Sequence, residues 1–442
     1  METDMKQYTL LLLLLVLLPF GTMAQDKPQR WTLRDCLDYA LANNIQVKKS
    51  KVSYLSGQED TEQAKAQLFP SLSASVTQGF VNYPSSEAVN NNSYSGNYSV
   101  NASWTLFDGN RRNNAIKQQR IQNQVDELSI EQSEDDIQIS LVQTYMQVLY
   151  ATEAVRINRN TVEVSKAQRD RAAELLKAGS ISAVDLAQLE SQYSTDKYQL
   201  VVAQTNLDNY KLQLKQLLEL DINEDIELDI PQLTANDVLV PLPDKQQIYN
   251  TSLSVMPEVR SSRLNIDIAE LETKKARAGY LPSLSLNAGI GTGHLSGTDY
   301  TFGSQVWNKF NESFGVTLSI PIFTNRENKT AVNKAKLAVT TSQLELLNTQ
   351  KGLLKAVESI YLDATSSQTQ FTSATEQLKY VEESYKLTAE QFFLGMKNTV
   401  ELLTEKNNLL TARQEVLQAK YMAIMSIQLL NIYQKKPVQL AV

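Results

Sequence analysis

A seven-residue apolar repeat that occurs twice, at a fixed distance, constrains the fold of this chain more than any other feature. The first copy places apolar residues at Leu186, Tyr193, Leu200, Leu207 and Leu214. The second copy begins 216 residues later and occupies Leu402, Leu409, Val416, Ala423 and Leu430. Such a sustained repeat is typical of helices that pack along one another over many turns. Its duplication predicts two copies of one structural unit.

One glycine precedes each apolar repeat at the same offset, Gly179 in the first copy and Gly395 in the second. We predict a tight turn at each glycine, between a very long helix and the helix that returns along it. Neither Pro nor Gly occurs from 111 to 178, so a helix about 100 Å long is expected there. The two helical hairpins are predicted over residues 111–220 and 326–433.

In front of each helical hairpin, apolar residues occupy every second position instead. The alternating runs are Leu72 to Val76, Tyr98 to Leu106, Leu284 to Ile290 and Phe314 to Ile320. We predict strand hairpins over residues 71–107 and 283–322, with strands of about ten residues, the length that crosses a bilayer when tilted. One face is aliphatic and the other consists of Ser, Thr, Asn and Gly, which is typical of a membrane β-barrel.

The remaining segments complete the two repeats. Helices are predicted over residues 32–67 and 258–280, each directly before a strand hairpin. We predict that the first repeat covers residues 25–230 and the second repeat 258–442. A proline-rich linker over residues 231–257 joins them.

The chain begins with a pattern that is typical of export. Lys6 precedes the apolar run Leu10 to Leu18, and a small-residue cleavage pattern follows at Thr22-Met23-Ala24. We therefore predict a signal peptide over residues 1–24 and a mature chain that begins at Gln25. No other run approaches eighteen apolar residues, so a helical membrane protein is not expected.

Four strands cannot close a barrel, and an open sheet edge is not tolerated in lipid. The protomers are therefore expected to pool their strands. Eight strands would form a barrel filled by its own side chains, whereas twelve or more would leave a lumen. The residues alone leave a dimer, a trimer and a tetramer open.

The sequence holds no constellation that predicts catalysis, a cofactor or a metal site. The chain has one histidine, His294, and one cysteine, Cys36, so no multi-histidine metal site or histidine-based triad is expected within a protomer. His294 is predicted in a solvated loop, and Cys36 in the buried face of the first helix. The net charge of -7 argues against nucleic acid as a partner. We predict a protein that is not an enzyme.

Several local patterns occur in the same order in both copies. They are Pro70-Ser71-Leu72 and Pro282-Ser283-Leu284 at the strand starts, Leu106-Phe107-Asp108-Gly109 with its parallel Ile322-Phe323-Thr324-Asn325, and the Gly-x5-Asp/Glu-Leu turns at Gly179–Leu186 and Gly395–Leu402. In these features the chain resembles the TolC/OprM family of outer-membrane efflux and secretion channels. The resemblance implies a mainly α protein with membrane β: a homotrimer whose twelve strands form one barrel in the outer membrane and whose twelve helices form a periplasmic tunnel. A periplasmic adaptor and an inner-membrane pump are the implied partners.

The resemblance also implies a gate at the helix tips. Acidic residues after the tip glycines correspond to Asp185 and Glu401, and a basic residue that pairs with them corresponds to Lys397. Thr404 stands where the family often has a further Asp, and Phe392 where some members have a Tyr. These two departures imply fewer locking hydrogen bonds and a less acidic constriction. The alternative role for Asp185 and Glu401 is helix capping near the turn, and the two roles are compatible.

We therefore predict a passive exit duct for an efflux or type I secretion system. The alternative is a periplasmic coiled-coil scaffold or adaptor without a pore. Such a scaffold has no use for strand hairpins with an aliphatic outer face, so the strands distinguish the two hypotheses.

Overall fold

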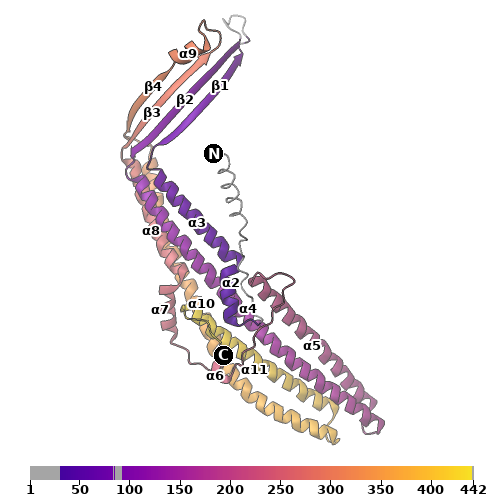
Figure 1. Cartoon of the computed structure of the whole chain (residues 1–442). Coiled ribbons are helices and arrows are strands. Elements are labelled where there is room, and N and C mark those ends of the chain that lie inside the picture. The colour runs from indigo at the N-terminus through magenta and orange to yellow at the C-terminus, as the bar shows by residue number, and fades with distance from the viewer. Residues whose placement is uncertain (1–29, 83, 85–91, 441–442) are drawn as a thin grey trace, which may run out of the picture.

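The computed structural model describes residues 30–82, 84 and 92–440. Its shape is elongated, with a β-sheet at one end and the turns of two helical hairpins at the other (Figure 1). The predicted signal peptide, residues 1–24, lies outside the described residues. Among the helices of the described residues, none combines the length and apolar character that crossing a membrane requires.

Two long helical hairpins dominate the structure, and they repeat residue by residue. The long helices are α4 (Arg111–Lys177) and α10 (Glu327–Phe393), each of 67 residues. The return helices are α5 (Ala183–Leu217) and α11 (Thr399–Tyr433), each of 35 residues. Every one of these bounds differs from its counterpart by 216, so the duplication predicted from the apolar repeat is confirmed. A helix of 67 residues is about 100 Å long.

The first predicted helix, 32–67, is wrong as a single element. It is divided into α2 (Leu33–Asn43) and α3 (Ile45–Ala66), with Asn44 between them. The Asn44 side chain caps α3 by accepting a hydrogen bond from the Gln46 backbone N–H at 2.8 Å. Its amide nitrogen also donates to the carbonyl of Leu217 at the end of α5, at 3.2 Å. The Asn44 side chain makes both hydrogen bonds, and the backbone at this residue is not helical.

The same division occurs in the second repeat. The helices α7 (Lys245–Val255) and α8 (Pro257–Arg277) meet at Met256, which lies 212 residues after Asn44. A short 3₁₀ helix (Ala278–Tyr280) follows α8. In the predicted linker, α6 (Ala235–Val238) and α7 lie among extended segments. The second repeat of helices therefore starts earlier than residue 258, at α7.

The strands form one antiparallel sheet in the order β1-β2-β3-β4. Their bounds are Ser71–Asn82, Asn92–Phe107, Ser283–Leu295 and Asn311–Ser319. Three strands are thus longer than the predicted ten residues. Val76 pairs with Tyr98, and Val100 with Ile290, so the predicted apolar positions share one face because directly paired residues point the same way. The strands β1 and β4 are the two edges of the sheet.

The expected loop around His294 is partly wrong, because β3 continues to Leu295 and a short helix, α9 (Phe302–Asn308), follows. His294 is half-buried on β3 and not solvated in a loop. Its partner in β2 is Gly96, and the imidazole occupies the space where a side chain at Gly96 would lie. The ring of Phe302 lies 4.9 Å from that of His294, so aromatic contacts hold the histidine.

The largest apolar core lies midway along the molecule, where buried residues of α2, α4, α5 and α11 form one cluster and α2 packs against α4. Cys36 lies there, fully buried as predicted. Burial raises the pKa of the Cys36 thiol to about 12. Tyr145 is also buried in this core, and its hydroxyl donates to the carbonyl of Asp229 at 2.9 Å. This core attaches the segment after α5 to the middle of the long helix.

Candidate functional site

The two tip turns have the same backbone structure. Gly179 and Gly395 have positive φ angles of 75° and 73°, a conformation that glycine adopts without the steric cost of a side chain. The Gly179 N–H donates to Leu176 and the Ser180 N–H to Leu175, which is the Schellman pattern that ends a helix. Gly395 and Met396 repeat this pattern after α10. Both predicted tip glycines therefore lie in the turns that end the long helices.

Asp185 and Glu401 occupy equivalent positions in the return helices. Each is the third residue of its helix, and its carboxylate accepts a hydrogen bond from the backbone N–H of the capping residue. The capping residues are Ser182 for α5 and Asn398 for α11. Both acids therefore complete a reciprocal capping pair that satisfies free amide groups at the helix start. The capping alternative is thus present in the structure, with each acid three residues after the cap.

Asp185 makes a second contact, which joins the two hairpins. Its Oδ1 accepts a hydrogen bond from the Thr399 hydroxyl, at the start of α11, at 2.6 Å. The donors Thr399 and then Ser182 hold the pKa of the Asp185 carboxyl below its usual value, because they stabilise the charged form. Thr399 is 1 % exposed. Asp185 thus ties the first tip to the second, and Thr399 was not predicted from the sequence.

Glu401 contacts its own turn instead. Lys397 Nζ donates to Glu401 Oε1, and the Asn398 backbone N–H donates to Oε2. These contacts, with Lys397 first, lower the pKa of the Glu401 carboxyl. Within the described part of this protomer, Lys397 forms an ion pair with Glu401 and none with Asp185. Thr404 is exposed, and its hydroxyl donates to the Val400 carbonyl at 2.8 Å.

Phe392 packs inside the tip and does not line its surface. It is 6 % exposed and belongs to a small apolar cluster with Ala172, Leu189 and Leu402. Its ring contacts Phe393 edge-on, with 5.4 Å between the centroids. The cluster includes residues of all four long and return helices, so it holds the two tips together.

Sequence reasoning missed a buried ion pair further along the hairpins. Lys406 of α11 contacts Asp196 of α5, and both side chains are almost fully buried. A signal for it exists, because Asp196 lies seven residues after the buried Leu189, and Lys406 lies between Leu402 and Leu409 at core spacing. A charge on an apolar seam is unusual and points to a buried partner.

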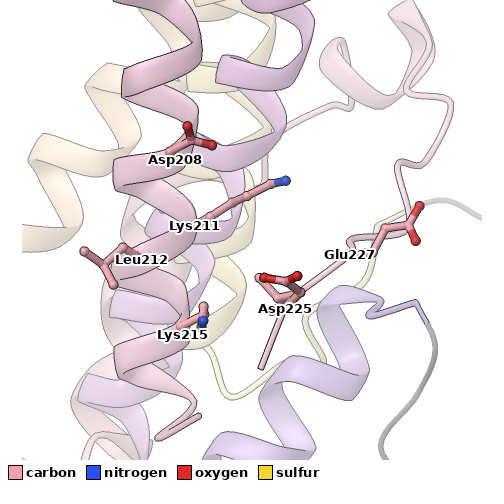
Figure 2. A pocket seen from close by; sticks show the side chains of 7 residues that line it. Asp208, Lys211, Leu212, Lys215, Asp225 and Glu227 are labelled. Atoms are coloured by element: carbon pink, nitrogen blue, oxygen red, sulfur yellow. The ribbon is translucent and has the colours of Figure 1, made fainter. Parts of the chain in front are cut away.

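A polar groove lies elsewhere, between α5 and the segment that follows it. Figure 2 shows Asp208, Lys211 and Lys215 on α5, with Asp225 and Glu227 on the neighbouring segment. Side chains of both charges line this groove. Among the described residues, no group of three or more His, Cys, Asp or Glu side chains is placed to hold a metal ion. The groove thus presents mixed surface charge and no recognisable reactive group.

Known proteins are similar to this chain in sequence over most of its length. The sequence model of the outer membrane efflux protein family matches residues 36–219 and again 248–431. TolC, an outer membrane protein of Salmonella enteritidis, is 22 % identical over 340 residues, which cover 75 % of this chain and 66 % of TolC. PrtF, a proteases secretion protein of Dickeya chrysanthemi, is 22 % identical over 71 % of this chain and 68 % of PrtF. The chain therefore spans about two-thirds of the length of these relatives.

Solved structures share the fold. The outer membrane protein VceC of Vibrio cholerae superposes with a TM-score of 0.75 and 14 % identity, covering 92 % of this chain and 97 % of VceC. The CmeC outer membrane channel of Campylobacter jejuni gives a TM-score of 0.73 and 19 % identity, covering 92 % of this chain and 87 % of CmeC. The double family match covers most of the chain and coincides with its two structural repeats, so the resemblance inferred from the sequence is confirmed. This chain belongs to the outer membrane efflux protein family.

Proposed function

We propose that this chain is one protomer of a homotrimeric exit duct, which passes substrates from the periplasm or an inner-membrane pump to the cell exterior. The observation that carries the proposal is the combination of a duplicated pair of 67-residue helices with a four-stranded sheet at one end. The duct is passive, so the energy for transport comes from the partner pump. Its location is the outer membrane, as the family description and the TolC relatives indicate.

The sheet supports the sharing of strands between protomers. Its apolar face carries large exposed side chains, among them Leu72, Val76, Phe314, Val316 and Leu318, which are 59–75 % exposed in the single protomer. Water is a poor solvent for such a face, whereas outer-membrane lipid suits it. Each protomer also offers two unpaired edges, β1 and β4. Three copies joined edge to edge form a closed barrel of twelve strands, which removes the edges.

The tips support docking of a periplasmic adaptor. Four apolar side chains at the tip turns are 59–74 % exposed, namely Val184, Leu394, Met396 and Val400. A cluster of this kind at the end of an elongated molecule favours contact with another protein. We assign the adaptor, and through it the inner-membrane pump, to this end of the duct.

The same tips provide the gate. Asp185 and Glu401 act there with Lys397, and the turns at Gly179 and Gly395 set the path of the helices. Asp185 contributes most, because its bond to Thr399 joins the two hairpins. Phe392 supports the tip by packing in its apolar cluster. Thr404 is neutral, so the constriction is less negatively charged than it would be with a further acid at this position. The gate is thus held by few polar contacts.

A scaffold without a pore is not favoured, because the family and its relatives are outer-membrane efflux and secretion proteins. The test is to extract the protein from the membrane fraction with detergent and to insert it into planar lipid bilayers. We expect discrete conductance steps from the purified protein. Release without detergent, together with no conductance, would contradict the duct and support the scaffold.

A further inference from the structure

The short helix α9 packs on β3 at the end of the sheet that lies away from the long helices (Figure 1). The Thr292 hydroxyl of β3 donates to the Val306 carbonyl of α9, and the rings of His294 and Phe302 are in contact. Because side chains along a strand alternate between the two faces, Thr292 and His294 share the apolar face with Ile290. The helix therefore lies on the outer surface of the proposed barrel and not inside it.

Polar contacts hold α9 in this place. The Gln305 side chain is 8 % exposed, and its amide oxygen accepts a hydrogen bond from the Leu295 backbone N–H at 2.7 Å. Its amide nitrogen donates to the Tyr300 carbonyl at 2.9 Å. The helix also covers Thr292 and His294, two polar residues of the face that is proposed to meet lipid. It is thus a built part of the outer surface of the sheet.

The free surface of α9 and its flanks carries large aromatic side chains. Trp307 is 81 % exposed, Tyr300 is 66 % exposed and Phe310 is 51 % exposed. In the sequence of the corresponding connection of the first repeat, 83–91, the aromatic residue is Tyr83 alone. Rings of this kind, with a polar atom at one edge in Trp and Tyr, are favoured where an apolar medium meets water. The second repeat alone therefore provides such an aromatic surface on a helix.

The level of α9 on the sheet matches the outer edge of the apolar band of a membrane barrel. His294, which contacts α9, lies ten residues after Leu284, at the start of β3. At about 3.3 Å per residue and a strand tilt of about 40°, this distance corresponds to roughly 25 Å along the membrane normal, which is the height of the apolar band in such barrels. The helical end of the sheet faces the periplasm, so α9 lies at the level of the outer leaflet.

The charges of this connection favour an apolar contact over an electrostatic one. From 296 to 312 the charged residues are Asp299, Lys309 and Glu312, so neither sign dominates and a strongly charged partner is not attracted. The exposed rings are also continuous with the apolar face of the sheet, which meets lipid in the proposed barrel. The occupant that fits this surface is therefore membrane lipid, at the boundary between acyl chains and headgroups.

We infer that α9 is an interfacial anchor, which inserts Trp307, Tyr300 and Phe310 into the outer leaflet of the outer membrane, where the acyl chains meet the headgroups. This inference rests on the proposed barrel and adds a lipid contact on the outside of its wall. Each protomer contributes one α9, so three anchors surround the barrel of the proposed trimer. Together they fix the depth of the barrel in the membrane.

The test measures the fluorescence of Trp307 in phosphatidylcholine vesicles. The chain has two other tryptophans, Trp31 and Trp104, so the difference in emission between the wild type and Trp307→Phe isolates Trp307. We expect this difference to fall when the acyl chains are brominated, and to fall more with bromine near the headgroup end of the chain than near its methyl end. Equal emission in brominated and plain vesicles would overturn the inference, as would quenching that requires added anionic phosphatidylglycerol.

Two further variants make the test independent of one substitution. Phe310→Trp in the wild-type background adds emission next to α9, and the added emission should be quenched in the same way; added emission that bromine leaves unchanged contradicts the anchor. The control is Ile222→Trp in the Trp307→Phe background, because Ile222 is 87 % exposed and lies after α5, outside the sheet. Bromine should not quench it. Wild-type protein that forms channels in planar bilayers without quenching of Trp307 contradicts the anchor alone, whereas protein that forms no channels contradicts the proposed function.

Discussion

The first and second tips have the same backbone conformation, but their acidic side chains contact different partners. Both end a long helix at a glycine and begin the return helix with a reciprocal capping pair. In the first tip, the acid Asp185 reaches across to Thr399 of the other hairpin. In the second tip, the acid Glu401 bonds Lys397 of its own turn. Duplication thus preserved the local geometry that glycine and capping impose, while the contacts beyond the turn diverged.

The two tips also differ in how tightly their apolar side chains are packed. Substitutions at these side chains should have the largest effect among substitutions at the tips. Leu402 is fully buried in the apolar cluster, whereas its counterpart Leu186 is only partly buried. We expect Leu402→Ala to lower the free energy of unfolding by about 2–5 kcal/mol, because it leaves a cavity. Leu186→Ala should cost clearly less. Urea unfolding of the two variants tests this difference, and equal losses would show that the tips are packed alike.

The acids provide the next test of the comparison. We expect Asp185→Ala with Glu401→Ala to loosen the closed tip, because each substitution removes a carboxylate that caps the start of a return helix. Of the single variants, Asp185→Ala should raise single-channel conductance more, because, of the two acids, only Asp185 contacts the other hairpin. Thr404→Ala, at an exposed site, serves as the control. Unchanged conductance in the double variant would count against a gating role.

The smallest effect concerns pH. Asp185 and Glu401 have lowered pKa values in the folded protein, so their stabilising contribution is present above the unfolded values of about 4. It is lost as the pH falls through the folded pKa values. Thr399→Val removes the largest cause of the Asp185 shift and leaves the contacts of Glu401 in place. We expect acid opening of the variant channel at a higher pH than in the wild type. An identical pH profile would mean that Asp185 does not hold the tip.

The fold was largely predictable because its signals are periodic. The apolar repeat from Leu186 and its copy from Leu402 predicted two equal hairpins, and the alternation of residues such as Leu72 and Val76 predicted the strands. The break at Asn44 was not predictable, because it depends on the Leu217 carbonyl, which is distant in the sequence. The placement of His294 was likewise not predictable, because its ring occupies space that is free only since Gly96, in the neighbouring strand, has no side chain.

The candidate site was less predictable than the fold. The resemblance indicated Asp185 and Glu401 by position, but the partner of Asp185 comes from another helix. Thr399 looks like an ordinary residue near a helix start until the structure places it beside Asp185. Lys406 and Asp196 do interrupt apolar seams in the sequence. Only the packing of α5 against α11 shows that the two charges meet.

The central claim is that three protomers form one continuous duct. Negative-stain electron microscopy of the detergent-purified protein tests it most directly. We expect three-fold symmetric cylinders about 130–140 Å long, the sum of the helix length and the bilayer thickness. Thin rods that stay soluble without detergent would contradict the duct.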